Sequence, residues 1–169
     1  MSSKGASFCP IPHTFRDQVW LAVGGLIGVA VGAAVMRSYT RTSSVSASSV
    51  PRVLDGPARV VHIPGMLSID EHVGNAGNGD AGISIATVEV EKACVEATQR
   101  PLFDEYVLVQ KGEMHVSVGG DGKEVLVARA GQMLHLPRGH LYTYSFPGPA
   151  SYVPVCLPAF KPELSGRIE

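Results

Sequence analysis

One segment near the N-terminus, Val19–Met36, constrains this chain most, because eighteen consecutive residues carry no charged or strongly polar side chain. Arg16 and Asp17 stand before it, and Arg37 follows it. At the rise of an α-helix the run covers about 27 Å, close to the ~30 Å hydrocarbon layer of a bilayer. The segment therefore predicts a single transmembrane α-helix over residues 19–36, in contact with membrane lipids.

Two other interpretations of this segment compete with a membrane anchor. A signal peptide would need an unusually long leading region, interrupted here by Pro10 and Pro12. A buried core helix should show a polar stripe and few glycines, because each glycine costs about 1 kcal/mol relative to alanine. We therefore favour a retained anchor over both alternatives.

Three glycines lie at intervals of four residues inside the predicted helix: Gly24, Gly28 and Gly32. This spacing places them on one helix face, where the absence of side chains lets a second helix approach closely. Gly and Ala are also common in membrane helices, so the pattern could arise by chance. We interpret it as a packing face for a helix of another subunit.

The predicted domains follow from changes in composition along the 169 residues. Residues 1–18 are an N-terminal polar segment, 19–36 the transmembrane helix, and 37–50 a Ser/Thr-rich linker with no pattern that could pack a core. Residues 51–169 are the folded domain, which is long enough for one core.

Charge and cysteine content argue against several classes of partner and site. The net charge is -1, and Lys and Arg are scattered, so no basic patch for nucleic acid is visible. Cys9, Cys94 and Cys156 form no C-x-x-C pair, which argues against a disulfide scaffold or a cysteine-rich zinc site. They are expected to be reduced and to behave as small apolar side chains.

The folded domain is expected to be all-β. Short apolar or alternating runs, separated by turns rich in Gly and Pro, are typical of a β-sandwich or barrel. The predicted strands are residues 59–63, 83–90, 106–109, 114–118, 125–128, 133–136, 142–146 and 152–157. Residues 74–82 (GNAGNGDAG) predict a flexible loop.

Two motifs in this domain carry a family resemblance. Residues 103–116 contain Glu105, six further residues and then Gly112, which resembles the second half of the first cupin motif. Residues 131–142 contain Gly131, Pro137, Gly139 and Tyr142, which resembles the second cupin motif. The resemblance implies a cupin-type jelly-roll barrel. Within cupins, the Phe-Asp-Glu-Tyr-Val run at 103–107 looks most similar to the ethanolamine-utilisation protein Q group.

Strand alternation agrees with the resemblance. Phe103, Glu105, Val107 and Val109 are expected on the inward face of one strand, and Gly112 supplies the turn into the next. Met114, Val116 and Val118 are expected to face inward on that next strand, opposite Glu113, His115 and Ser117.

A cupin metal site requires three histidines and one carboxylate. The first two histidines would fall among Thr98, Gln99, Arg100 and Pro101, and the third at Tyr142, so only Glu105 remains of the four ligands. We therefore expect no metal and no other cofactor.

The remaining histidines of the domain do not readily replace the missing ligands. His115 and His135 have the parity of the outward face of their strands. His140 follows the Pro137–Gly139 turn at the expected pocket mouth and is the one candidate that could replace a missing ligand.

Two classes of function follow. In the first, the barrel is a non-catalytic accessory or structural module, and Glu105 hydrogen-bonds Tyr142 across the interior. In the second, the resemblance implies an acetate-kinase-like phosphotransferase, with Asp104, Glu105, His140 and Tyr142 as candidate catalytic residues. No Gly-rich phosphate loop leads into a helix, which counts against the second class, and we favour the first.

Partners and location are expected from the anchor and from one strand surface. Tyr106 and Leu108 are apolar on the outward face of the Glu105 strand, so this surface should meet another subunit or a second copy in a homodimer. A short anchor with a small domain is analogous to accessory subunits of respiratory-chain complexes in the mitochondrial inner membrane. The orientation of the helix stays open, because positive charges occur on both sides of it: Lys4 and Arg16 before it and two arginines after it.

Overall fold

The computed structural model describes residues 7–8, 50–120 and 122–168. The predicted helix 19–36, its three glycines and the linker up to residue 49 lie outside the described residues, so the anchor stays a prediction. Within the described ranges, no helix is both long and apolar enough to cross a bilayer.

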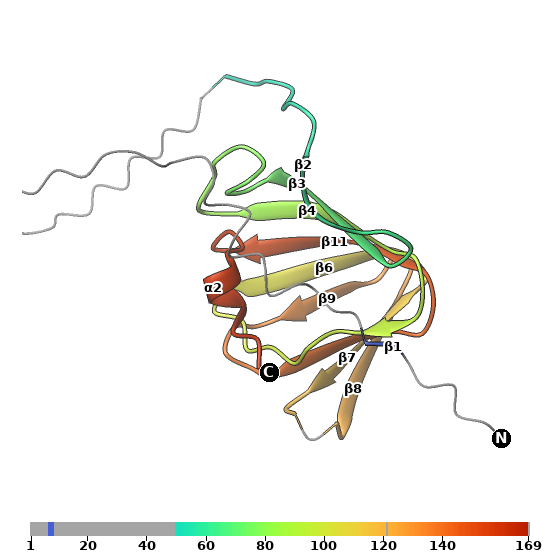
Figure 1. The fold of residues 1–169 in the computed structure, drawn as a ribbon. Coiled ribbons are helices and arrows are strands. Elements are labelled where there is room, and N and C mark those ends of the chain that lie inside the picture. Colours follow the sequence, from blue (N-terminus) through green and yellow to red (C-terminus); the bar gives the residue numbers. More distant parts are fainter. Residues whose placement is uncertain (1–6, 9–49, 121, 169) are drawn as a thin grey trace, which may run out of the picture. The chain divides into compact units, whose positions relative to one another are not determined.

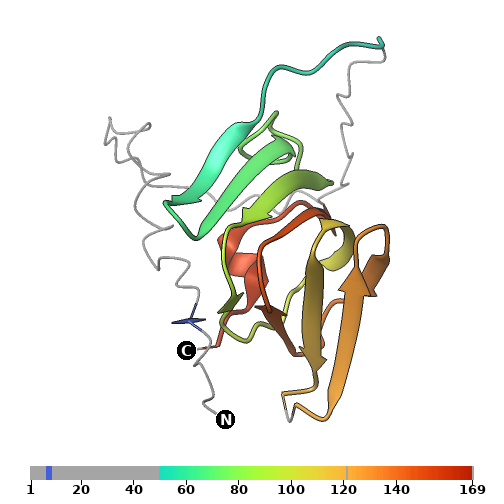
Figure 2. The ribbon, with the colours of Figure 1, turned by 90° about the vertical axis from the view of Figure 1, so that its right-hand side faces the viewer.

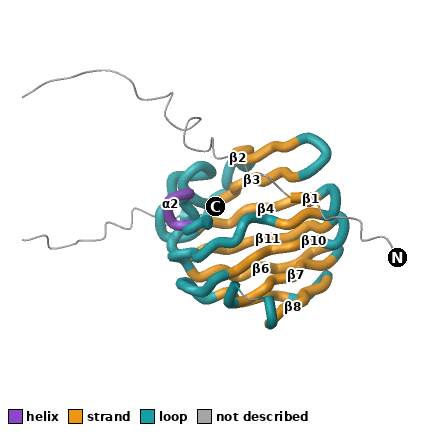
Figure 3. Tube along the Cα trace, turned by 60° about the horizontal axis from the view of Figure 1, so that its bottom comes forward, coloured by secondary structure: helices purple, strands orange, loops and turns teal. Residues whose placement is uncertain are grey.

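The described domain consists of two antiparallel sheets that face each other, with one parallel strand pair at an edge (Figures 1 and 2). The first sheet has the order β1-β5-β10-β7-β8 and the second has the order β2-β3-β4-β11-β6-β9. Figure 3 shows the strands side by side, with β2 and β3 at one edge. The strands are β1 (Ser7–Phe8), β2 (Ala58–Ile63), β3 (Leu67–Val73), β4 (Ser84–Val90), β5 (Cys94–Val95), β6 (Asp104–Lys111), β7 (Glu113–Val118), β8 (Glu124–Arg129), β9 (Met133–Leu136), β10 (Tyr142–Phe146) and β11 (Ala150–Leu157).

All eight predicted β-segments are strands, so the all-β prediction is confirmed for the described part of the chain. The sequence pattern missed β1, β3 and β5, as well as the four-residue helix α2 (Pro162–Ser165). β3 carries two acidic residues and a histidine among its seven positions, which hides its alternation. β1 and β5 have two residues each, too few for any period to show.

The core confirms the predicted alternation. Val107 and Val109 are buried on the inward face of β6, Phe103 is buried directly before β6, and Met114 and Val116 are buried on β7. Since successive residues of a strand point to opposite faces, the same register brings the carboxyl group of Glu105 into the interior. The alternation of side chains along β6 therefore buries both its apolar residues and the acidic residue Glu105.

The loop at residues 74–82 is confirmed as a loop, and one side chain organises it. The carboxylate of Glu71 on β3 accepts hydrogen bonds from the backbone N–H groups of Ala76, at 2.6 Å, and Gly77, at 3.0 Å. Gly74 opens the loop with φ +138, where a Cβ would lie 2.3 Å from the Glu71 carboxylate. Glu71 thus has a structural role for which the sequence carried no motif.

Candidate functional site

The strongest candidate site is a group of buried polar side chains between the two sheets, here called the interior polar cluster: Glu96, Gln99, Glu105 and Tyr144. Glu105 comes from β6 and Tyr144 from β10, while Glu96 and Gln99 lie on the segment that follows β5. A backbone bridge between Gln99 and Tyr142 ties this segment to β10. The cluster therefore draws on both sheets.

Glu105 and Tyr144 form the central contact of the cluster. The Tyr144 hydroxyl donates a 2.6 Å hydrogen bond to Oε2 of Glu105. Burial raises the pKa of Glu105 to about 7; the Tyr144 hydrogen bond opposes this shift, and the nearby Glu96 charge adds to it. A carboxyl group with such a pKa exchanges its proton near neutral pH, which is a property of general acids and bases.

The predicted hydrogen bond from Glu105 to Tyr142 is wrong. The Tyr142 hydroxyl donates instead to the carbonyl oxygen of Pro137, at 2.8 Å. Tyr142 and Tyr144 stand two residues apart on the same inward face, so alternation alone could not decide between them. The tertiary fold decides it, because Tyr142 lies at the start of β10, within reach of the Pro137 turn.

Glu96 is the second buried acid of the cluster. Burial raises its pKa, and the charge of Arg167 opposes the shift. A guanidinium nitrogen of Arg167 lies 3.8 Å from Glu96 Oε2. Glu96 therefore has a cation beside it that favours its charged form, whereas the group that contacts Glu105 is a neutral hydroxyl.

Cys156 on β11 is the backbone register partner of Glu105. Burial raises the pKa of its thiol strongly, and the charge of Glu105 acts in the same direction. Because the thiolate is the nucleophilic form, this cysteine is held in an unreactive state. It is suited to packing and not to covalent catalysis.

The four candidate catalytic residues do not form one group. Glu105 and Tyr142 are buried, whereas Asp104 faces outward and forms an ion pair with Arg138 that holds its carboxyl pKa at about 2. The His140 side chain is exposed, and its ring centroid lies 6.3 Å from that of Tyr142. Asp104 and His140 thus lie outside the interior polar cluster, to which Glu105 belongs.

The outward parity predicted for His115 and His135 is confirmed. His115 bonds Glu113 on the same strand at 3.1 Å, and His135 stacks on Tyr106 with ring centroids 4.5 Å apart. Among the residues that the structure describes, no group of three or more His, Cys, Asp or Glu side chains is placed to hold a metal ion.

The motif glycines have conformational reasons to be glycine. Gly112 has φ +70 at the turn between β6 and β7, and a Cβ there would lie 2.4 Å from the carbonyl oxygen of Pro149. Gly131 and Gly139 also adopt positive φ, at +85 and +83, with open space around them. The motif thus preserves backbone turns, and Gly112 additionally preserves a close approach of two loops.

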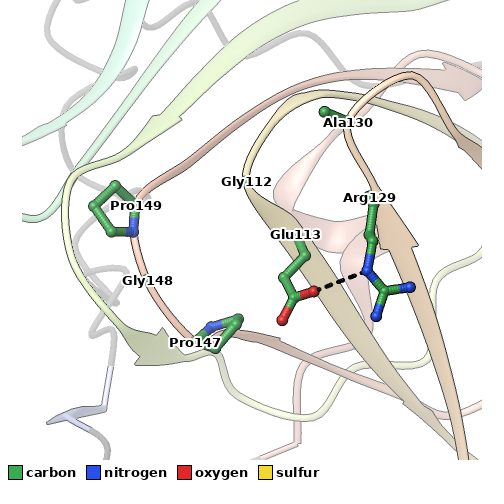
Figure 4. Close-up of a pocket in the computed structure, with 7 residues that line it drawn as sticks. All are labelled: Gly112, Glu113, Arg129, Ala130, Pro147, Gly148 and Pro149. Carbon is green, nitrogen blue, oxygen red and sulfur yellow. Dashed lines mark ion pairs between the residues drawn. The ribbon is translucent and has the colours of Figure 1, made fainter.

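A surface pocket of ≈ 480 Å³ lies at the opposite end of β6 from Glu105 (Figure 4). The turns around Gly112, Ala130 and Gly148 form it, and the ion pair between Glu113 and Arg129, at 3.4 Å, lies on one wall, with Pro147 and Pro149 on the other side. Seven residues of extended strand, about 23 Å, separate Gly112 from Glu105. The pocket is therefore distinct from the interior polar cluster.

Of the interior polar cluster, the sequence pattern had indicated only Glu105 as a site residue. Tyr144 could have been found, because it shares the parity of Tyr142 and Phe146, which are also buried. Glu96 and Arg167 are seventy-one positions apart, and neither lies in a motif. No local pattern could have paired them.

Comparison with known proteins supports the fold and leaves the family open. No family model matches the sequence. Endoribonuclease YbeY of Myxococcus xanthus is 36% identical over 99 residues, which are 57% of this chain and 33% of that protein. The chain thus spans about a third of the length of the curated relative it matches.

Solved structures with the same fold are more numerous. A variant of Bacillus subtilis oxalate decarboxylase matches with a TM-score of 0.55 and 10% identity over 70% of this chain and 34% of its own. A Streptomyces PAC13 variant solved with uridine has a TM-score of 0.54 and 15% identity, and the match covers 69% of this chain and 88% of that protein. An RmlC-like cupin from Shewanella frigidimarina has a TM-score of 0.51 and 18% identity, and the match covers 62% of this chain and 86% of that protein.

The ethanolamine-utilisation group is also among the similar structures, but more weakly. The EutQ protein of Clostridium difficile has a TM-score of 0.45 and 18% identity, covering 56% of this chain and 70% of its own. The structures with TM-scores above 0.5 show that the described domain has a cupin-like all-β fold.

Proposed function

We propose that the chain is a non-catalytic, cupin-like accessory subunit that binds another protein through the outer surface of its larger sheet. The observation that carries this proposal is an apolar patch on β6, β9 and β11, here called the outer apolar face. It consists of Tyr106, Leu108, Met133, Val153 and Val155.

Register places these side chains next to one another. Leu108 lies between Val153 of β11 and Met133 of β9, and Tyr106 lies beside Val155. The exposed fraction of Met133 is 60% and that of Tyr106 is 37%. Adjacent apolar side chains over three strands are unusual on a surface that meets only water, and they are typical of a protein contact.

The interior supports a binding role over catalysis. The carboxyl group of Glu105 is engaged by Tyr144, and in the described part of the chain every buried side-chain nitrogen or oxygen has a hydrogen-bond partner. A substrate would have to displace these contacts. The only α-helix that the structure describes has four residues, and the loop at 74–82 contains no Lys or Arg, which disfavours the phosphotransfer alternative.

The remaining part of the proposal is the setting. Residues 19–36 attach the domain to a membrane, most simply the mitochondrial inner membrane, and the partner is a subunit of a respiratory-chain complex. The uncharged segment and its glycine spacing support the anchor, and the complex is proposed by analogy.

The β1 strand makes the anchor testable. Phe8 pairs with Val95, so in this state residues 7–8 lie on the same side of any membrane as the barrel. A single crossing by residues 19–36 would separate them. With the neighbouring native thiols removed by Cys9→Ser and Cys94→Ala, we therefore expect a disulfide between Phe8→Cys and Val95→Cys in chains kept out of membranes, and none in chains assembled in native membranes. A disulfide in the assembled form would contradict a single span.

The binding role is tested by purifying the full chain from detergent-solubilised membranes and identifying the proteins that migrate with it on a native gel. Leu108→Glu, at the centre of the outer apolar face, should remove the partner because it buries an unpaired charge in the contact. Val125→Glu, on the exposed face of β8 in the other sheet, is the matched control, because it also replaces an aliphatic side chain by a carboxylate. If Leu108→Glu retains its partner as well as Val125→Glu does, the outer apolar face is not the interface.

A further inference from the structure

The C-terminal segment, residues 162–168, lies along residues 98–102 at one end of the sheets, where Figure 1 shows α2. Three backbone hydrogen bonds join the two segments. The N–H of Leu102 donates to Leu164 O at 2.8 Å, that of Arg100 to Gly166 O at 2.9 Å, and that of Ile168 to Thr98 O at 2.8 Å. Residues 162–168 therefore cover the stretch that carries Gln99 of the interior polar cluster.

Apolar burial contributes little to this attachment. Within residues 162–168 only Ser165 is buried and Leu164 is half-buried, while the exposed fraction of Ile168 is 50%. The helix α2 has four residues, too few to be stable alone. Segments with few buried apolar contacts open at a much lower free energy than the core strands.

One side chain connects this weakly held segment to the interior. Arg167 lies 3.8 Å from Glu96, and their side chains are 30% and 6% exposed. The other titratable groups near Glu96 are Glu105 on β6 and Tyr144 on β10, and neither carries a positive charge. Loss of Arg167 would leave a buried carboxylate without a cation, which favours states that hydrate it.

We propose that residues 162–168 form a releasable strap that closes one end of the barrel over the interior polar cluster, and that the Arg167–Glu96 ion pair controls how often the strap opens. Opening frees the N–H groups of Arg100 and Leu102 and hydrates Glu96. It also loosens Phe160, whose N–H donates to Ser84 Oγ beside Cys156.

The first test is hydrogen exchange on the full chain in detergent, comparing wild type with Arg167→Met. Methionine keeps much of the length of the side chain and removes its charge. Amide exchange of residues 98–102 and 162–168 should accelerate at least about tenfold, because the buried partner loses its cation. Exchange in β7 should stay at the wild-type rate, since the core is not involved.

Arg138→Met is the matched control, because Arg138 forms an ion pair with the solvent-accessible Asp104. Such pairs contribute little, so exchange of residues 98–102 should not change. Unchanged exchange in Arg167→Met would overturn the role of the ion pair. Acceleration of β7 to the same extent would mean global unfolding, and would also overturn the proposal.

A second variant acts on the strap without altering any charge. Gly166 has φ +57, and a Cβ there would lie 2.3 Å from the carbonyl oxygen of Arg100, so Gly166→Ala should push the strap away. Gly148→Ala is the control, because a Cβ there meets nothing within 4 Å.

The gating of the interior is measured by thiol labelling of Cys156, in a background where Cys9→Ser and Cys94→Ala remove the other thiols. Labelling should be slow in wild type and in Gly148→Ala, and at least about tenfold faster in Gly166→Ala. Faster exchange of residues 98–102 without faster labelling of Cys156 would show that the strap opens but does not gate the interior, which overturns the proposal.

Discussion

Replacement of Glu105 by glutamine tests whether a buried carboxyl group makes the stability of this fold depend on pH. Burial raises the pKa of Glu105 from 4.5 to about 7. A carboxyl group whose pKa is higher in the folded state stabilises the fold while it is protonated. Its contribution is therefore complete below about pH 4.5 and is lost as the pH rises towards about 7.

The size of the effect follows from the two pKa values. Each tenfold change in proton affinity is worth 1.36 kcal/mol, so the full contribution is about 3 kcal/mol, of which about 2.5 kcal/mol is lost between pH 5 and pH 8. Glutamine stays neutral at both values and still accepts the Tyr144 hydrogen bond. Allowing about 1 kcal/mol for an amide donor that lacks a partner, Glu105→Gln should be more stable than wild type by about 2 kcal/mol at pH 8.

The assay is urea unfolding of the full chain in detergent, followed by far-ultraviolet circular dichroism from pH 4.5 to pH 8.5, because the one tryptophan of the chain, Trp20, lies in the predicted anchor and not in the barrel. The stability of Glu105→Gln should depend on pH less steeply than that of wild type. Glu113→Gln, which lies in a partly exposed ion pair, should keep the wild-type pH dependence. Equal destabilisation of Glu105→Gln at every pH would refute the reasoning, because it would mean that Glu105 is ionised and stabilising in the folded state.

Three further predictions concern the turn, the metal and the enzymatic alternative. Gly112→Ala should lose at least about 2 kcal/mol of unfolding free energy because its Cβ would meet the carbonyl oxygen of Pro149, whereas Gly139→Ala, in open space, should lose only about 1 kcal/mol by urea titration. Elemental analysis of the purified chain should find far less than one transition metal per chain, and one metal per chain would contradict this prediction. The full chain should not transfer phosphate between ATP and acetate; turnover that Glu105→Gln abolishes would favour the phosphotransferase.

The sequence determined the class of fold because strands and turns leave patterns that can be recognised within a few consecutive residues. Period-two alternation identified eight strands, including the inward positions of Val107 and Val109 on β6. The motif glycines marked their turns because positive φ suits residues without a side chain. A strand is missed where this local signal fails, as in β3, whose inward face includes the charged Glu71.

Only the tertiary structure decided which polar groups meet inside the barrel. Tyr142 and Tyr144 have the same parity, yet Tyr144 reaches Glu105 and Tyr142 reaches the Pro137 turn. Such partners depend on how strands far apart in the chain are placed relative to one another. Alternation fixes the face on which a side chain lies, but not the partner it meets across the core.

The same limit applies to the C-terminal strap. No pattern around Arg167 indicates that it reaches a buried acid, and Gly166 looks like an ordinary glycine until its approach to the backbone of Arg100 is known. Both roles arise when the last residues fold back on the segment after β5. Local sequence therefore specified the elements and their faces, whereas contacts between distant segments were specified only by the packing of the whole domain.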